Sequence, residues 1–333
     1  MTPPLLAVHD LAVHFTTRAG TVRAVAGVTF AIAPGETVGL VGESGCGKTT
    51  LGRAIVGLVP AAEGSVELEG HELVGLDRAA MRVHRPRLQM IFQDPYASLN
   101  PRLTVGRIIE EPLLVHRRGT RVERRTEVAR LMERVGLHPD WARRHPHEFS
   151  GGQRQRVAIA RALALNPRLV ICDEPVSALD VSVQAQVINL LVDLQQERGL
   201  SYLFVSHDLS VVQHIADRVM VMYLGRLVEV ADREAFWSLP LHPYSRALLD
   251  AVPLPEWRPA ARAPRQLLQN EMPSPLHPPS GCRFRTRCPY ATDTCAAVEP
   301  PLRPLRGGRL VACHYVEEEA GSLVHPGASH RIR

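Results

Sequence analysis

The stretch GESGCGKT at residues 42–49 constrains what this chain can fold into more than any other part of the sequence. It fits the pattern G-x-x-x-x-G-K-[S/T], and it lies between an apolar run at 38–41 and an apolar helical pattern that begins at Thr49. Glycines let the backbone of such a turn direct its N–H groups inward, and the following helix adds the positive end of its dipole. The order of strand, glycine-rich turn and helix therefore predicts an α/β fold with a phosphate-binding loop.

The residue types in this loop indicate its ligand. Lys48 can reach the β- and γ-oxygens of a nucleoside triphosphate, and the Thr49 hydroxyl can bind Mg²⁺. A glycine-rich turn with an incidental lysine is the plainer interpretation, but the strand before it and the helix after it argue against that. The predicted nucleotide contacts of the loop are Gly42, Glu43, Ser44, Gly45, Cys46, Gly47, Lys48, Thr49 and Thr50.

A second stretch, LVICDEP at 169–175, supplies the acids that such a site needs. Its four apolar residues predict a buried strand, which ends in Asp173 and Glu174. An acid at the carboxyl end of a parallel strand lies at the ligand-binding edge of the sheet. We expect Asp173 to bind Mg²⁺ and Glu174 to polarise the attacking water. With the apolar run at 202–206 and helices between the strands, the pattern favours a parallel sheet.

The stretch SGGQ at 150–153 predicts a second anion site. Ser150, Gly151 and Gly152 precede an apolar helical pattern, so backbone N–H groups and a hydroxyl are exposed at a helix N-terminus. One chain already has a phosphate site at 42–49. A second phosphate-binding edge implies that two chains face each other and complete each other's pocket, whereas a simple helix cap is the alternative.

Taken together, the motifs resemble those of the ATP-binding cassette (ABC) ATPases. Besides the two phosphate-site motifs, the chain has stretches similar to the family's signature, Q-loop, D-loop and switch-histidine segment: EFSGGQRQRVAIARAL (148–163), IFQDPYASLNP (91–101), SALD (177–180) and VSHD (205–208). The family's signature usually opens with Leu, and here Phe149 takes that position. The resemblance over about residues 5–230 implies an ATPase with a RecA-like mixed sheet core, an antiparallel β subdomain and a helical signature subdomain.

The resemblance also implies roles for individual residues. Gln93 links Mg²⁺ and the water to a membrane partner, and His207 senses the γ-phosphate. Phe15 is the candidate for the aromatic side chain that stacks on adenine, with Val22 as the alternative. The implied catalytic residues are Glu174, His207 and Gln93; the implied Mg²⁺ ligands are Thr49, Gln93 and Asp173; and the implied nucleotide contacts outside the loop are Phe15, Ser150, Gly151, Gly152, Gln153 and Asp180.

Three details resemble one subfamily, the ATPases of dipeptide and oligopeptide importers. They are DPYASLNPRLTV in the Q-loop, HPHEFSGGQRQR before and in the signature, and HPYSRALLDAVP at 242–253. The resemblance implies a nucleotide-binding domain at 1–238, with its helical subdomain at about 95–165, and an importer-type extension at 239–333. Twelve of the 27 prolines fall between Pro253 and Pro304, which predicts an irregular extension with little long helix or strand.

The subfamily implies a complex. Its parts are two integral-membrane permeases, a second and usually non-identical ABC ATPase, and an extracytoplasmic solute-binding protein that acts indirectly. Residues 96–105 would lie where a permease docks, although a solvated turn also suits them. Nickel or another small solute is the alternative cargo. A soluble, non-transport ABC ATPase is a further alternative, but the chain has one phosphate loop and no sustained heptads. A plain P-loop kinase would lack SGGQ.

Charge and hydropathy set the expected location. The net charge is +5, but the Arg residues of 121–134 alternate with Glu at helical spacing, which indicates a solvated helix face and no nucleic-acid partner. No apolar run reaches the roughly 18 residues that a membrane span needs, and the N-terminus lacks the pattern of a secretory signal. We therefore expect a peripheral protein on the cytoplasmic face of the inner membrane.

Six cysteines remain to be explained. Cys46 and Cys172 are expected as small apolar fillers. Four others, Cys282, Cys288, Cys295 and Cys313, lie in a short, proline-rich segment, and disulfides are not expected in a reducing cytoplasm. Their wide spacing favours a [4Fe–4S] cluster over zinc, which prefers close pairs, and free thiols are the third alternative. Nothing in the sequence connects this segment to the nucleotide site, so we expect it to be peripheral to hydrolysis.

Overall fold

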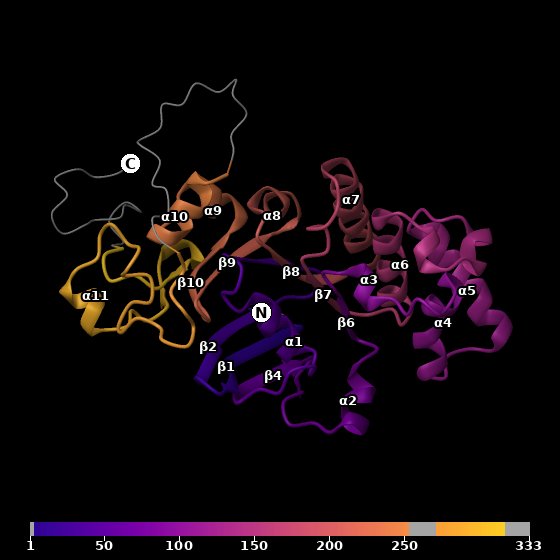
Figure 1. Cartoon of the computed structure of the whole chain (residues 1–333), viewed down its shortest axis with the longest axis horizontal. Helices are drawn as coiled ribbons and strands as arrows, with labels where there is room; N and C mark the ends of the chain where they lie inside the picture. Colours follow the sequence, from indigo (N-terminus) through magenta and orange to yellow (C-terminus); the bar gives the residue numbers. More distant parts are fainter. Residues whose placement is uncertain (1–2, 253–270, 317–333) are drawn as a thin grey trace, which may run out of the picture.

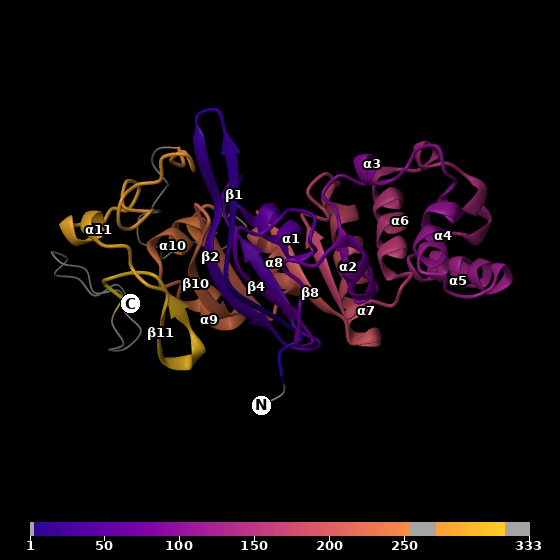
Figure 2. The same cartoon turned by 90° about the horizontal axis from the view of Figure 1, so that it is seen from below.

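A computed structural model of the chain describes residues 3–252 and 271–316. These residues form two β-sheets with helices around them, as Figure 1 shows. A helical region lies at one end of the molecule and the Cys-rich segment lies at the other, with the two sheets between them in both views (Figures 1 and 2). The segment that carries four cysteines is therefore far from the helical region and next to the sheets.

The smaller sheet is antiparallel, with the strand order β2-β1-β4-β5. Its strands are β1 (Leu6–Thr17), β2 (Gly20–Ile32), β4 (Glu63–Leu68) and β5 (His71–Glu72). β1 and β2 form a long hairpin that projects from the sheet layer in Figure 2. The expected antiparallel strands are present, but β1 and β2 span 12 and 13 residues, because their pairing continues as far as the turn after Thr17.

The larger sheet is mixed and carries the expected RecA-like core. Its strand order is β11-β12-β10-β9-β3-β8-β7-β6, and β9, β3, β8, β7 and β6 run parallel. The strands are β3 (Thr37–Val41), β6 (Leu88–Ile91), β7 (Leu169–Asp173), β8 (Ser201–Ser206), β9 (Arg218–Tyr223), β10 (Arg226–Asp232), β11 (Arg303–Pro304) and β12 (Leu310–Val311). Parallel strands place their carboxyl ends at one edge, so the loops after β3, β6, β7 and β8 meet there.

Every residue of β3, β7 and β8 is buried, because both faces of the larger sheet are covered. One face packs on the antiparallel sheet and on α1 (Lys48–Ile55). The opposite face packs on α7 (Val181–Arg198), α8 (Leu209–Ile215) and the helical region. Two further short helices, α2 (Arg78–His84) and α9 (Arg233–Ser238), lie beside the sheets. In the two described ranges, no helix has the length and apolar character needed to cross a membrane.

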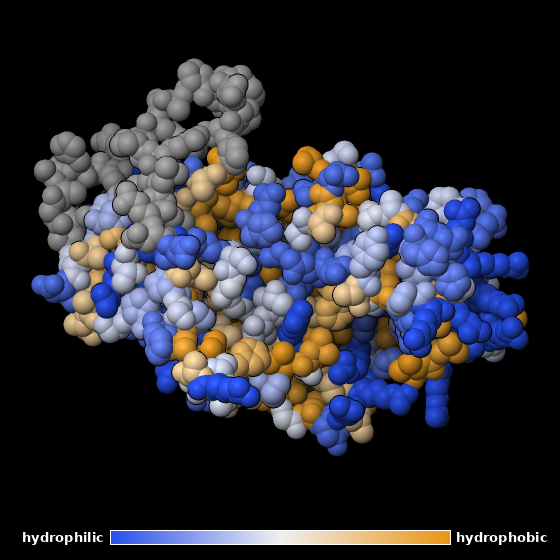
Figure 3. All heavy atoms as spheres, viewed as in Figure 1, coloured by the Kyte–Doolittle hydropathy of each residue, from blue (hydrophilic) through white to orange (hydrophobic). Residues whose placement is uncertain are grey.

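The helical region is formed by residues 95–163. Its elements are α3 (Pro95–Ser98), α4 (Val105–Val115), α5 (Arg121–Arg134), η1 (Pro139–Arg143), η2 (Pro146–Glu148) and α6 (Gly151–Leu163). The basic helix α5 buries only Val128, Leu131 and Met132, and its Arg130 pairs with Glu127. The face of this region in Figure 3 is mostly hydrophilic. Both observations fit the expected solvated face of residues 121–134.

In its described residues, the extension has only short helices and strands, and it packs against the core. Its elements are α10 (Pro243–Asp250), α11 (Asp293–Ala297), η3 (Arg306–Gly308) and the short strands β11 and β12, which continue the larger sheet. Phe284 is 2% exposed and packs in the main core against Tyr223 and Tyr244. Part of the proline-rich stretch, residues 253–270, lies outside the described residues.

Candidate nucleotide-binding site

The glycine-rich loop after β3 takes a conformation that only glycine allows at two positions. Gly42 has φ 153°, and a Cβ there would lie 2.3 Å from the Met222 carbonyl oxygen. Gly47 has φ 110°, and a Cβ there would lie 2.1 Å from the Ala24 carbonyl oxygen. At these two positions the loop passes between the hairpin and β9 with no room for a side chain. This close passage holds it at the carboxyl edge of the sheet.

Helix α1 begins directly after this loop, and its N-terminus is open. Gly47 is its N-cap residue and supplies no side-chain cap, so the first backbone N–H groups are free to bind an anion. Lys48 is 4% exposed, and its Nζ donates to the carbonyl oxygens of Gly42 and Glu43 at 2.8 and 2.9 Å. A positive charge is thus held at the same place as the helix terminus, which suits the phosphates of a nucleotide.

Thr49 and Asp173 meet beside the loop, as the sequence predicts for Mg²⁺ ligands. The Thr49 hydroxyl donates to Asp173 Oδ1 at 2.7 Å, and Asp173 is fully buried at the end of β7. Burial raises the pKa of the Asp173 carboxyl, and its Oδ2 has no hydrogen-bond partner within the described residues. A buried carboxylate oxygen without a donor beside a hydroxyl is a donor set that fits a hard cation such as Mg²⁺.

The three predicted catalytic side chains come together from three strand ends. Gln93 Nε2 donates to Glu174 Oε2 at 2.9 Å, and His207 Nδ1 lies 3.2 Å from the same oxygen. The Glu174 side chain is 11% exposed, and its backbone adopts φ 46°, a left-handed conformation rare for this residue type. Its N–H donates to the Val205 carbonyl oxygen, so β8 holds the backbone in that conformation. The carboxylate is thus fixed at the mouth of the loop.

These groups line one cavity of about 450 Å³, a size usual for ligand sites. The predicted residues that line it are Ser44, Gly45, Cys46, Gly47, Lys48, Thr49, Thr50, Gln93, Glu174 and His207. Sequence reasoning missed Arg23, Ala24, Leu224, Gly225 and Pro275, which also line it. No motif marks these five, because they reach the cavity from the hairpin, the β9–β10 turn and the extension.

The adenine-stacking prediction concerns the β1–β2 hairpin. Phe15 pairs with Val22 across the two strands and is 41% exposed. Val22, the alternative candidate, lines the cavity, whereas Phe15 is not among the lining residues. Both residues therefore lie near the mouth of the site, and the structure brings Val22 closer to the loop.

The signature residues lie outside this cavity, at the start of α6 in the helical region. Ser150 caps the helix: its hydroxyl accepts from the Gln153 N–H, and its own N–H donates to Gln153 Oε1. Gly152 packs so closely that a Cβ would lie 2.3 Å from Val183. Gly151 also lies in this first turn, and the exposed Asp180 precedes α7. Within one chain, these residues do not reach the phosphate loop.

The four cysteines of the extension line one small cavity, together with His242 and Phe284. Burial raises the pKa of Cys282 to about 11 and that of Cys288 to about 12, and it also raises the pKa of Cys313. Across residues 3–252 and 271–316, no three His, Cys, Asp or Glu side chains gather closely enough to hold a metal ion. The geometry therefore does not support the expected [4Fe–4S] cluster on Cys282, Cys288, Cys295 and Cys313. Cys46 and Cys172 are buried, as expected of fillers.

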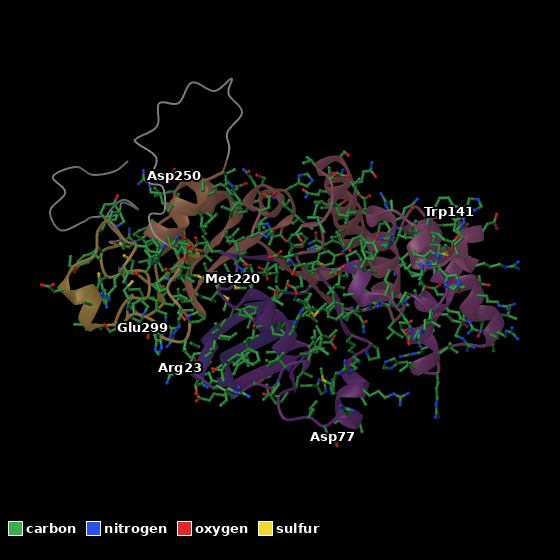
Figure 4. The ribbon with its side chains drawn as sticks, viewed as in Figure 1. Arg23, Asp77, Trp141, Met220, Asp250 and Glu299 are labelled. Carbon is green, nitrogen blue, oxygen red and sulfur yellow. The ribbon has the colours of Figure 1, made fainter. Side chains whose placement is uncertain are left out.

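The extension also contacts the nucleotide site, which corrects the expectation that it is peripheral. Pro275 lines the cavity, and a Cβ on Gly45 would lie 3.5 Å from Met272. The Tyr244 hydroxyl accepts a hydrogen bond from the Glu43 N–H at 2.8 Å, and Arg287 pairs with the Glu43 carboxylate. Nearer the surface, Glu299 of the extension, which Figure 4 labels, pairs with Arg226 of β10 and with Arg283.

Comparison with known proteins agrees with this arrangement. The family described as "ABC transporter" matches residues 25–177, and "Oligopeptide/dipeptide transporter, C-terminal region" matches residues 228–295. A solved dimeric structure of the ATP-binding cassette MJ0796, in a post-hydrolysis state bound to ADP and Pi, superposes with TM-score 0.64 at 30% identity. It covers 68% of this chain and 98% of that one. The fold is therefore that of an ABC ATPase.

Two curated relatives match almost the whole chain. The putative oligopeptide transport ATP-binding protein YkfD of Bacillus subtilis is 55% identical over 313 residues, covering 93% of this chain and 95% of that protein. The oligopeptide transport ATP-binding protein OppF of Escherichia coli is 55% identical over 308 residues, covering 90% and 92%. The chain belongs to the family of ATP-binding subunits of oligopeptide and dipeptide ABC transporters.

Proposed function

We propose that this chain hydrolyses ATP to energise the import of dipeptides or oligopeptides. The observation that carries the proposal is the convergence of Gln93, Glu174 and His207 at the mouth of the phosphate-loop cavity. All three side chains needed for turnover are in place, so hydrolysis is the activity that fits best. The assignment of peptides as cargo rests on the relatives' names and on the C-terminal family match.

The residues divide the chemistry between them. Lys48 and the N–H groups at the start of α1 bind the phosphates, and Thr49 and Asp173 hold Mg²⁺. When bound, Mg²⁺ offsets the negative charge that develops on the phosphate oxygens. Glu174 accepts a proton from the attacking water, while Gln93 and His207 hold its carboxylate in position. The left-handed backbone of Glu174 keeps this carboxylate directed at the cavity.

Two cassettes complete the site. Ser150, Gly151, Gly152 and Gln153 form a second helix N-terminus that cannot serve the cavity of its own chain, because it lies in the helical region. In the proposed dimer, the signature and Asp180 of one cassette face the nucleotide of the other. ATP binds both cassettes and favours the closed dimer, and hydrolysis allows it to reopen.

The proposed partners are two integral-membrane permeases, a second ABC ATPase and, indirectly, an extracytoplasmic solute-binding protein. The proposed permease-docking segment begins at Tyr96, which is 65% exposed although it is a large aromatic side chain. The Arg154 guanidinium stacks on its ring, 3.6 Å from the centroid, and fixes its orientation. An exposed aromatic ring held in place three residues after Gln93 suits a contact that links a partner to the ATP site. Such docking places the chain at the cytoplasmic face of the inner membrane.

The rate of ATP hydrolysis by the reconstituted complex tests this proposal. The chain, its partner ATPase and the permeases are placed in liposomes, and ATP hydrolysis is measured with the solute-binding protein loaded with peptide or with nickel. Stimulation by peptides supports the assignment, whereas stimulation by nickel alone favours the alternative cargo. Turnover that responds to neither, and needs no permease, would point to a soluble ABC ATPase.

The four-cysteine cavity is the place to test the remaining sequence prediction, a [4Fe–4S] cluster, with zinc or free thiols as alternatives. The supporting observation is that four thiols from distant positions share one cavity. The lack of a close group of metal ligands in the described chain counts against it. Anaerobic purification followed by iron, sulfide and zinc analysis decides the matter. Colourless, metal-free protein with titratable thiols excludes the cluster.

A further inference from the structure

Arg287, a residue of the Cys-rich segment, forms an ion pair with Glu43 of the phosphate loop. Arg287 NH1 lies 2.5 Å from Glu43 Oε2, and NH2 lies 2.9 Å from Oε1, so the contact is bidentate. Paired hydrogen bonds of this kind are among the strongest that side chains make, and they fix orientation as well as distance. Glu43 is the first variable residue of the loop, and Arg287 lies 244 positions further along the chain.

The arginine of this ion pair is buried and makes further contacts. The Arg287 side chain is only 3% exposed, compared with 29% for Glu43. Its guanidinium lies 5.9 Å from the ring centroid of the buried Tyr223. The backbone N–H of Arg287 donates to the Phe284 carbonyl oxygen within the same turn. Hydrogen bonding to Glu43 raises the pKa of the Arg287 guanidinium, so this side chain stays charged. Separating such a buried arginine from its carboxylate partner costs free energy, because a charge would then be buried without a partner.

Glu43 is also joined to the phosphate-binding lysine. Its carbonyl oxygen accepts from Lys48 Nζ at 2.9 Å, and its N–H donates to Tyr244 at 2.8 Å. The next residue along, Ser44, lines the nucleotide cavity. The backbone of Glu43 therefore links the extension to the part of the loop that faces the phosphates.

The negative charge of Glu43 would weaken nucleotide binding if no positive charge neutralised it. A free carboxylate one residue from the cavity repels a ligand that carries several negative charges, and a partly buried pair is screened less than one in water. Arg287 cancels that charge and directs the carboxylate away from the cavity. We propose that Arg287 is a positioning residue of the nucleotide site, which neutralises and holds Glu43 and so sets the affinity of the phosphate loop for nucleotide phosphates.

The inference rests on the proposed use of residues 42–49 as the phosphate loop. It extends that proposal by giving the Cys-rich extension a part in nucleotide binding. Arg287 directly precedes Cys288, which lines the four-cysteine cavity. A change in the conformation of this turn would therefore alter the Arg287–Glu43 ion pair, although the cavity itself does not contact the nucleotide.

The test compares four forms of the full-length chain: wild type, Arg287→Met, Glu43→Gln, and the double variant. Binding is followed with fluorescent trinitrophenyl derivatives of ADP, with Mg²⁺, and of adenosine. Arg287→Met leaves the carboxylate unpaired, so the dissociation constant for the ADP derivative should rise about tenfold, a usual size of coupling between linked sites. Affinity for the adenosine derivative should not change, because it has no phosphates. Arg285→Met is the matched control, because the Arg285 guanidinium donates to the carbonyl oxygen and hydroxyl of Ser280 rather than to Glu43.

The double variant separates positioning from simple structural support. Removing both charges should restore affinity for the ADP derivative to within about threefold of wild type, because neutral replacement of a buried pair costs little. Glu43→Gln alone removes the negative charge beside the cavity, so it should bind the ADP derivative more tightly than wild type, and it covers the case in which Arg287→Met does not fold. An unchanged affinity in Arg287→Met, an equal loss for both derivatives, or a tenfold loss in Glu43→Gln overturns the inference. Wild type that binds no ADP derivative overturns the proposed nucleotide site instead.

Discussion

The replacement Tyr244→Phe tests how the extension holds the backbone of the phosphate loop. Tyr244 is fully buried on α10, and its hydroxyl accepts the hydrogen bond from the Glu43 N–H. Phenylalanine keeps the ring contacts with Tyr223 and Phe284 and removes only this acceptor. The change therefore isolates one hydrogen bond between the extension and the loop.

The magnitude follows from the unpaired N–H group that remains. A buried donor left without a partner costs about 1–3 kcal/mol, and the lower end applies here because the bond is only partly buried. A loss of about 1 kcal/mol lowers the melting temperature of a chain of this size by roughly 2 °C. The loosened Glu43 also no longer fixes the carbonyl oxygen that Lys48 contacts. We expect the affinity for MgADP to fall by about threefold to tenfold.

A second buried tyrosine provides the control. The Tyr202 hydroxyl donates to the Leu191 carbonyl oxygen at 3.1 Å, in the core between β8 and α7. Tyr202→Phe should cost a similar amount of stability and leave MgADP affinity unchanged. Thermal unfolding with and without MgADP measures both quantities. If Tyr244→Phe loses stability but binds MgADP as Tyr202→Phe does, the extension does not position the loop.

Two further predictions concern the metal ligands and the dependence of stability on pH. Thr49→Val removes the hydroxyl beside Asp173, so the gain in ADP affinity on adding Mg²⁺ should shrink by at least about tenfold. Titration of ADP with Mg²⁺ and with EDTA measures this gain. A gain equal to that of wild type contradicts the assignment of Thr49 as a Mg²⁺ ligand. Burial lowers the pKa of His242 to about 3, so the unfolded chain binds a proton that the folded chain excludes, and stability falls as the pH drops from about 6.5 towards 3. Between neutral pH and pH 5, this one residue should lower the free energy of unfolding by about 2 kcal/mol. His242→Asn keeps a capping side chain, and chemical unfolding of this variant should no longer show that loss. An identical pH profile for variant and wild type would show that His242 does not titrate in this way.

The sequence predicted the parts of the site that depend on local order. Each of the residues Lys48, Asp173, Glu174 and His207 begins, ends or directly follows a regular element at the edge of a parallel sheet, so strand periodicity and motif spacing are enough to bring them together. The antiparallel hairpin could be predicted for the same reason. Its exact register could not, and the choice between Phe15 and Val22 depends on that register.

The contacts of the extension could not be predicted, because they join distant residues without a repeating pattern. Arg287 is one of three arginines at alternate positions, and nothing in that spacing distinguishes one from another. In the structure they differ: Arg283 contacts Glu299, Arg285 contacts Ser280, and Arg287 contacts Glu43. Burial of Phe284 between two tyrosines turns the segment so that Arg287 faces the loop. Only the packed core decides this orientation.

The most direct test of the account is ATP turnover by Glu174→Gln in the assembled transporter. Glutamine keeps the shape of the side chain and can still contact Gln93 and His207, but it cannot accept a proton from water. We predict unchanged ATP binding and a turnover that falls about 100- to 10,000-fold, the usual contribution of a general base. Wild-type turnover by a complex that contains this variant in its normal amount would contradict the central claim that Glu174 drives hydrolysis here.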